Sequence, residues 1–285
     1  MKLIGKLLQD PLAISRAGKP GDKPEEKPKR GRKLAITPER TDKPLVERSV
    51  SMSNSLTRGA QNLNLSQKRL IALALAKTDS IPVLDLQNAT RNETGWRVRL
   101  FAHEYAESYE VDINTAYEQL QTSSHTLLKT LWKVVHEGKK GPVVTEGQWL
   151  ALAEYSSGEG RVDITFHHKI APHLLALRSQ FTTYKLKQAA ALRSIYSWRM
   201  FECLRSWQST GEWRVSIEDF HLAMDAPESC RADFGQLKRR IIDPAVLELK
   251  KKDGFIVEWD AERAGRKVIG LVFRFSPDPQ GRLAI

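Results

Sequence analysis

The chain has 285 residues, of which 41% are hydrophobic and 28% charged, a composition typical of a folded soluble protein with room for two domains. The 45 lysine and arginine residues exceed the 34 acidic residues by +11, so we expect a polyanionic partner, with nucleic acid ahead of a membrane surface. The two cysteines, Cys203 and Cys230, lack metal-ligand spacing and exclude a disulfide framework, which favours a reducing cytoplasm. No stretch reaches the ~18 uninterrupted apolar residues of a membrane span. No P-loop motif occurs either, so we do not expect ATP hydrolysis, and we expect neither a metal nor a cofactor.

Residues 1–45 differ in composition from the rest and are expected to form a disordered basic arm. From Ala17 to Pro44 the sequence is rich in lysine, proline and glycine and has few large apolar side chains. Such a segment cannot bury enough surface to offset the entropy of ordering it. Its basic cluster is formed by Lys27, Lys29, Arg30, Arg32 and Lys33. A DNA-tethering arm and a solvated linker both remain open.

The first folded domain is predicted over residues 46–175. A helix is expected from Ser66, as N-cap, to Ser80, followed by a strand from Gly95 and a helix from about Ala102. Asp112 is a good N-cap for a further helix over 113–132, whose apolar side carries Ala116, Leu120, Leu127, Leu128 and Leu131. These two helices form a candidate helix-turn-helix, and the strands WLALAEY and RVDITFHH after it form a hairpin. This order of elements is that of a winged helix.

The second domain is predicted over residues 176–278 and repeats this order, with a tail at 279–285. Two or three helices over 171–208 precede the strand EWRVS, the helix IEDFHLAMDA and the loop PESCRA. A basic helix follows at 233–254, and a hairpin at 255–275 carries Arg263, Arg266 and Lys267 at its tip. The predicted fold class is therefore α+β, with two tandem winged-helix domains after a disordered basic arm.

The basic helix has one apolar side, formed by Leu237, Ile241, Ala245 and Leu249. The residues expected to point away from it and to face DNA include Gln236, Arg239 and Arg240, whose side chains suit base edges. Lys238, Lys250 and Lys251 suit phosphates, and Arg231 in the preceding loop joins the same interface. An ordinary solvated face is the alternative. Pro244 is expected to kink or restart the helix, which leaves 233–243 as the segment that reads bases.

Three stretches together resemble one family, the iteron-binding replication initiators of bacterial plasmids, which have two winged-helix domains. They are NSLTRGAQNLNLSQKRLIALALAKTDS (54–80), the passage from Gly160 to Trp207, and DFGQLKRRII with the basic hairpin after it. The resemblance implies a bacterial cytoplasmic protein that binds directly repeated double-stranded sites at a plasmid origin as a monomer. It also implies a homodimer that represses its own gene, and contacts with the host initiator and the replicative helicase.

By resemblance, the helix that begins at Ile113 takes the recognition position of the first domain. Its exposed candidates are Asn114, Thr115, Tyr117, Glu118 and Gln121. Because Glu118 is acidic and the helix carries little positive charge, we expect this domain to hold the DNA backbone or to mediate dimerisation.

Two other functions compete with initiation. A transcription regulator with two winged helices would bind a single operator palindrome. A nicking enzyme would use His167 and His168 for a metal and Tyr184 or Tyr196 as nucleophile. Adjacent histidines on a strand point to opposite faces, so we expect no metal pair there and no enzyme.

Overall fold

The computed structural model describes residues 43–78, 81, 83–175, 180–252 and 255–277. The predicted basic arm and the predicted tail therefore lie outside the described residues, apart from 43–45 at the end of the arm. Within the described part, no helix is long and apolar enough to cross a membrane. The domain boundary at residue 175 stays a prediction.

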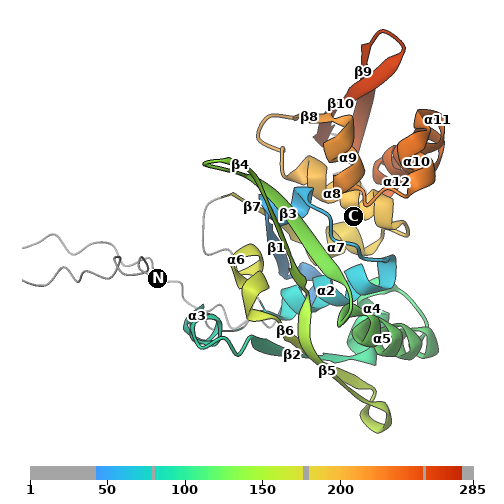
Figure 1. Ribbon diagram of the computed structural model, residues 1–285. Helices are drawn as coiled ribbons and strands as arrows, with labels where there is room; N and C mark the ends of the chain where they lie inside the picture. The colour runs from blue at the N-terminus through green and yellow to red at the C-terminus, as the bar shows by residue number, and fades with distance from the viewer. Residues whose placement is uncertain (1–42, 79–80, 82, 176–179, 253–254, 278–285) are drawn as a thin grey trace, which may run out of the picture. The chain divides into compact units, whose positions relative to one another are not determined.

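The first part of the chain is a winged helix (Figure 1). Its elements are η1 (Leu45–Glu47), β1 (Ser49–Ser53), α1 (Asn54–Arg58), α2 (Leu65–Thr78), α3 (Val83–Arg91), β2 (Trp96–Phe101), α4 (Ala102–Tyr109), α5 (Ile113–Leu127), β3 (Leu131–Gly138), β4 (Gly141–Gln148), β5 (Leu150–Ser156), η2 (Ser157–Glu159), β6 (Arg161–Phe166), η3 (His168–Ile170), α6 (Ala171–Leu174), β7 (Phe181–Lys185) and α7 (Leu186–Ala190).

The expected helix-turn-helix is confirmed as α4 and α5. Glu110 ends α4 in the left-handed region at φ 51°, and the Asp112 carboxylate accepts from the backbone N–H groups of Asn114 and Thr115. The antiparallel sheet β2-β6-β5 contains the expected hairpin as β5 and β6 and lies against these helices, with Val98 buried on β2. Capping and alternation in the sequence thus place these elements.

Several expected bounds in this part were wrong. The helix expected over 113–132 ends at Leu127, because Leu131 and Trp132 begin the strand β3, which pairs with β4. Leu131 is accordingly exposed. The second helix begins at Leu65 and not after a Ser66 cap: Asn64 Oδ1 accepts from the Gln67 N–H at 2.9 Å, while Gln67 Oε1 accepts from the Asn64 N–H at 3.0 Å. This reciprocal pair satisfies the helix start better than the serine does.

The stretch 171–208, in which two or three helices were expected and no strand, contains the strand β7. It pairs antiparallel with β1, with Val50 opposite Tyr184, so a segment near residue 50 and one near 183 lie side by side. The alternation of buried and exposed residues in β7 (Thr182 and Tyr184 buried) is the pattern of a strand with one covered face.

The second winged helix begins with a helix that also packs on the first. Its elements are α8 (Ile195–Arg205), β8 (Glu212–Ser216), α9 (Ile217–Ala223), α10 (Glu228–Ala232), α11 (Phe234–Leu237), η4 (Lys238–Ile242), α12 (Asp243–Lys252), β9 (Phe255–Ala264) and β10 (Lys267–Pro277). The sheet order is β8-β10-β9, and stacked rings of Trp213, Phe220 and Phe273 form its core with α9. The stretch PESCRA, expected to be a loop, contains the short helix α10.

The basic helix runs past Pro244 without a break. Just before the proline, η4 is a π-helical turn, in which the Asp243 N–H donates to the Lys238 carbonyl five residues back. A proline lacks an N–H and its ring would clash with the carbonyl of Arg240 in a regular α-helix, and the wider turn relieves both problems. The expected apolar side, Leu237, Ile241, Ala245 and Leu249, is fully buried.

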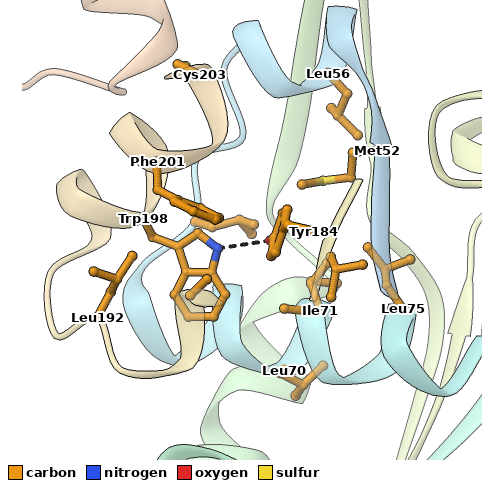
Figure 2. Close-up of a cluster of buried hydrophobic side chains, with 14 of the residues drawn as sticks. Met52, Leu56, Leu70, Ile71, Leu75, Tyr184, Leu192, Trp198, Phe201 and Cys203 are labelled. Carbon is orange, nitrogen blue, oxygen red and sulfur yellow. Dashed lines mark hydrogen bonds between the residues drawn. The ribbon is translucent and has the colours of Figure 1, made fainter. Parts of the chain in front are cut away.

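Buried charges join the two winged helices at α8. Lys68 of α2 lies 2.7 Å from the Glu202 carboxylate, and Arg199 donates to the carbonyls of Gly59 and Ala223 at 2.6 and 2.8 Å. Glu202 also accepts from the Tyr184 hydroxyl at 2.7 Å. Figure 2 shows that hydroxyl accepting in turn from the Trp198 indole, at 3.1 Å, among packed apolar side chains. Each charge is thereby paired, as burial requires.

Candidate nucleic-acid interface

The N-terminal half of the basic helix, the candidate recognition helix over 233–252, carries the predicted base-reading residues. Asp233 caps it, and its carboxylate accepts from the Gly235 N–H at 2.7 Å. The structure places Arg239 and Arg240 in the exposed positions expected for base reading, and Gln236 half-buried beside them. Leu237 on the opposite side fixes their orientation because it is fully buried.

The residues predicted to bind phosphates lie before, within and beyond that segment. Lys238 is exposed in η4, and Lys250 and Lys251 are exposed in the last turn of α12. At 1.5 Å per residue these two lysines are about 16–18 Å along the helix from Arg239. Arg231 is exposed, but its Nε donates to the Ala226 carbonyl at 2.6 Å. This hydrogen bond holds the guanidinium group against the loop before α10.

The wing is the β9–β10 hairpin, which lies beside α12 (Figure 1). Ala264 pairs with Lys267, so the turn has two residues, Gly265 and Arg266, and only Gly265 has positive φ, at 62°. This is the pattern of a type II′ turn, which matches the twist of the two strands. The three predicted wing residues, Arg263, Arg266 and Lys267, are all exposed at this tip. The second winged helix therefore exposes two basic groups of residues, one on the basic helix and one at the tip of the wing.

The first domain offers a less basic helix, α5. Asn114, Tyr117, Glu118 and Gln121 are exposed on it, and Thr115 is half-buried. Thr115 donates its hydroxyl to the Asp112 carboxylate, and these hydrogen bonds lower the pKa of Asp112 below its usual value. The Tyr117 ring rests on Gly160, where a Cβ would meet it at 2.3 Å. Asn114 and Gln121 are therefore better placed for a ligand than Thr115 or Tyr117.

The histidine pair differs from its sequence-based description. The strand β6 ends at Phe166, so His167 caps η3 and its ring stacks on that of His168 at 4.6 Å. The expectation of opposite faces was therefore wrong, because the two residues are not in a strand. In the part of the chain that the structure describes, no three histidine, cysteine or acidic side chains gather as metal ligands. Tyr184 is buried, and desolvation raises its pKa well above the usual value, so it stays protonated.

Sequence reasoning missed two aromatic residues of this candidate interface. Phe234 at the helix start and Trp259 on β9 lie with their rings edge to face, 6.3 Å apart, between helix and wing. Their signal in the sequence is weak, since an aromatic residue next to a basic helix is more often part of a core.

Comparison with known proteins identifies the family. The model of "Initiator Replication protein, WH1" matches residues 49–205, and that of "Initiator Rep protein, WH2" matches residues 216–275. An uncharacterized 27.6 kDa protein of Escherichia coli is 26% identical over 232 residues, which are 80% of this chain and 95% of that protein. A probable replication protein, rep, of Bifidobacterium longum (strain NCC 2705) is 28% identical over 115 residues, 40% of this chain and 38% of that protein.

A solved structure shares the fold. The Pi initiator protein, crystallised with iteron DNA, matches with a TM-score of 0.65 and 22% identity over 82% of this chain and 98% of that one. The expected architecture of two winged helices is thus confirmed by the family matches and by this neighbour. The chain belongs to the family of plasmid-type initiator replication proteins, with a WH1 and a WH2 domain.

Proposed function

We propose that this chain initiates replication by binding directly repeated sites, or iterons, in the double-stranded DNA of a plasmid origin. The observation that carries the proposal is the exposed row Lys238, Arg239 and Arg240 on the recognition helix of a WH2 domain. Arginine can bind guanine bidentately in the major groove, and the adjacent lysine adds affinity through phosphate. The fold shared with the Pi initiator, which was crystallised on iteron DNA, supports this proposal.

The two domains divide the work unequally in this proposal. The second reads bases through Gln236, Arg239 and Arg240 and holds phosphates with the lysines and the wing. The first domain contacts mainly the sugar-phosphate backbone of the DNA, through the polar face of α5 that carries Asn114 and Gln121. A weakly charged helix gains little from counterion release, so most of the affinity belongs to the second domain.

A second role of the first domain is dimerisation. The β3–β4 hairpin exposes Val135, Val143 and Val144, and Val135 and Val144 face each other across the two strands. Among the described residues no further strand pairs with β4, and an open apolar edge of this kind suits a second copy of the chain. In our proposal the dimer represses the protein's own gene and the monomer binds the repeats. Sedimentation of Val144→Asp against wild type tests this: an unchanged dimer fraction would remove the hairpin from the interface.

The later steps of initiation follow from the same proposal. The bound chains destabilise the adjacent AT-rich duplex and recruit the host initiator and the replicative helicase. The chain itself acts by binding and not by catalysis. Incubation of supercoiled origin DNA with Mg²⁺ or Mn²⁺ tests this point, because a nicked product that Tyr196→Phe abolishes would make it an enzyme.

Selection of bound DNA from a random pool, followed by footprinting of the natural origin, tests the central proposal. Protection of several direct repeats spaced by about two helical turns is expected of an initiator. Protection of one palindrome alone would favour the alternative of a transcription regulator.

A further inference from the structure

A groove separates the recognition helix from the wing, and both aromatic and basic side chains line it. Its volume is 510 Å³, and it is open to solvent along one side. Phe234 and Lys238 come from the helix, and Trp259 and Arg263 come from β9. The two rings are half-buried, so each has one covered and one accessible side.

Each cation in the groove lies over a ring that belongs to the opposite element. Lys238 Nζ is 5.7 Å from the centroid of the Trp259 ring, and Arg263 Cζ is 6.0 Å from that of Phe234. Cations within about 6 Å of a ring centroid are attracted by its negative face. The Phe234 ring of the helix therefore attracts Arg263 of the wing, and the Trp259 ring of the wing attracts Lys238 of the helix.

Two acidic residues also line this groove. Asp260 forms an ion pair with Arg274 at 3.0 Å, so its charge is already compensated. Asp243 is exposed at the first turn of α12, one helical turn beyond Lys238. An anion in the groove is therefore favoured beside Lys238 and Arg263 and disfavoured beside Asp243.

We propose that the groove holds one sugar-phosphate strand of the bound duplex, and that Phe234 and Trp259 are positioning residues for the two cations that contact it. The inference rests on the proposed DNA-binding function. When a helix enters the major groove and a wing contacts the neighbouring groove, the backbone strand that divides the two grooves lies between helix and wing. Long basic side chains lose rotamer entropy when they bind a phosphate, and a ring that already restrains them reduces that loss.

A double-mutant cycle on the full-length protein tests the role of Trp259. The probe is a fluorescein-labelled duplex of random sequence, about 20 base pairs long, titrated at several salt concentrations. Lys238→Ala should make the slope of log K against log salt shallower by about 0.9, the loss of one phosphate contact. Trp259→Leu should lower the affinity about two- to fivefold, the range of a cation–π contact. Trp259→Phe keeps a ring and should stay within about twofold of wild type.

The decisive measurement is the double variant K238A/W259L. If Trp259 acts through Lys238, the double variant binds no more weakly than K238A alone; independent, multiplied losses overturn the inference. The cycle of F234L with R263A asks the same question from the other side and decides it if W259L does not fold. If K238A and R263A each leave binding unchanged, then the proposed DNA-binding face is wrong, which is a different failure from that of the aromatic pair.

Discussion

Replacing Lys68 by methionine should destabilise the protein strongly, although the residue lies far from the proposed interface. The Lys68 ammonium is 2.7 Å from both the Glu202 carboxylate and the Gln61 side-chain oxygen, and both charged side chains are almost completely buried. Methionine has similar length and volume, so the substitution removes the charge and the hydrogen bonds but leaves little cavity.

The magnitude follows from what remains after the change. Glu202 would keep Tyr184 at 2.7 Å and Arg199 at 3.5 Å but lose its shortest ionic partner. Removing one partner of a buried pair costs about 3–5 kcal/mol, and the remaining arginine places the expected loss near the lower value, about 3 kcal/mol. Lys187→Met is the matched control, since Lys187 forms an exposed pair with Glu47 at 3.0 Å. An exposed pair contributes at most about 1 kcal/mol.

Urea unfolding followed by circular dichroism measures both free energies of unfolding. Equal losses of the free energy of unfolding in K68M and K187M would refute the reasoning, because breaking the buried ion pair would then cost no more than breaking the exposed one. The pH dependence gives a second check. Burial lowers the pKa of Lys68 from 10.5 to about 8, since desolvation outweighs the attraction of Glu202. Between these two pKa values the unfolded chain binds more protons than the folded one, so this residue's contribution to stability rises with pH across that window. The deficit of K68M should therefore widen from about pH 8 upward, by at most about 1.4 kcal/mol per pH unit.

Three further outcomes are expected. Arg239→Ala and Arg240→Ala should each cost about 1–3 kcal/mol on the specific site and much less on random DNA; equal losses on both DNAs, by fluorescence anisotropy, would reduce them to phosphate contacts. Asp225 accepts two backbone N–H groups through one carboxylate oxygen, so Asp225→Ala should cost about 1–3 kcal/mol in urea unfolding while Asp225→Asn, which keeps an acceptor, costs less. Cys203 and Cys230 are buried, and burial raises the pKa of Cys203 to about 11, so Ellman's reagent at neutral pH should label both thiols only after unfolding.

The sequence predicted the parts of the fold whose signals are local. The Asp112 cap, the strand expected from Gly95 and the apolar side of the basic helix are each read within a few residues, and each is confirmed. The exposed positions of Arg239 and Arg240 followed from the same helical periodicity. Their role in binding DNA stays a prediction.

The rest depends on contacts between residues far apart in the chain. The strand β7 pairs with β1, which lies about 130 residues earlier in the chain, with Ser53 opposite Phe181. The phenylalanine, threonine and tyrosine residues of β7 favour a strand, but a strand of five residues whose partner is so distant gives only a weak signal in the sequence. Lys68 lies near the start of α2, where a charged side chain is ordinarily exposed, yet it is buried because Glu202 lies opposite. The cations of the groove could be predicted as basic residues, but their crossed pairing with the two rings could not, since no local pattern joins Phe234 to a strand 25 residues later.

The π-helical turn at η4 has one more consequence, for the phase of the helix. A turn that closes from Asp243 back to Lys238 takes one residue more than a regular turn, and one residue corresponds to about 100° of rotation. Lys250 and Lys251 therefore point about a quarter turn away from the directions that a straight helical wheel assigns to them relative to Arg239. A redesign that moves Lys250 or Lys251 according to the residue spacing of an uninterrupted α-helix must therefore correct for this rotation of about 100°.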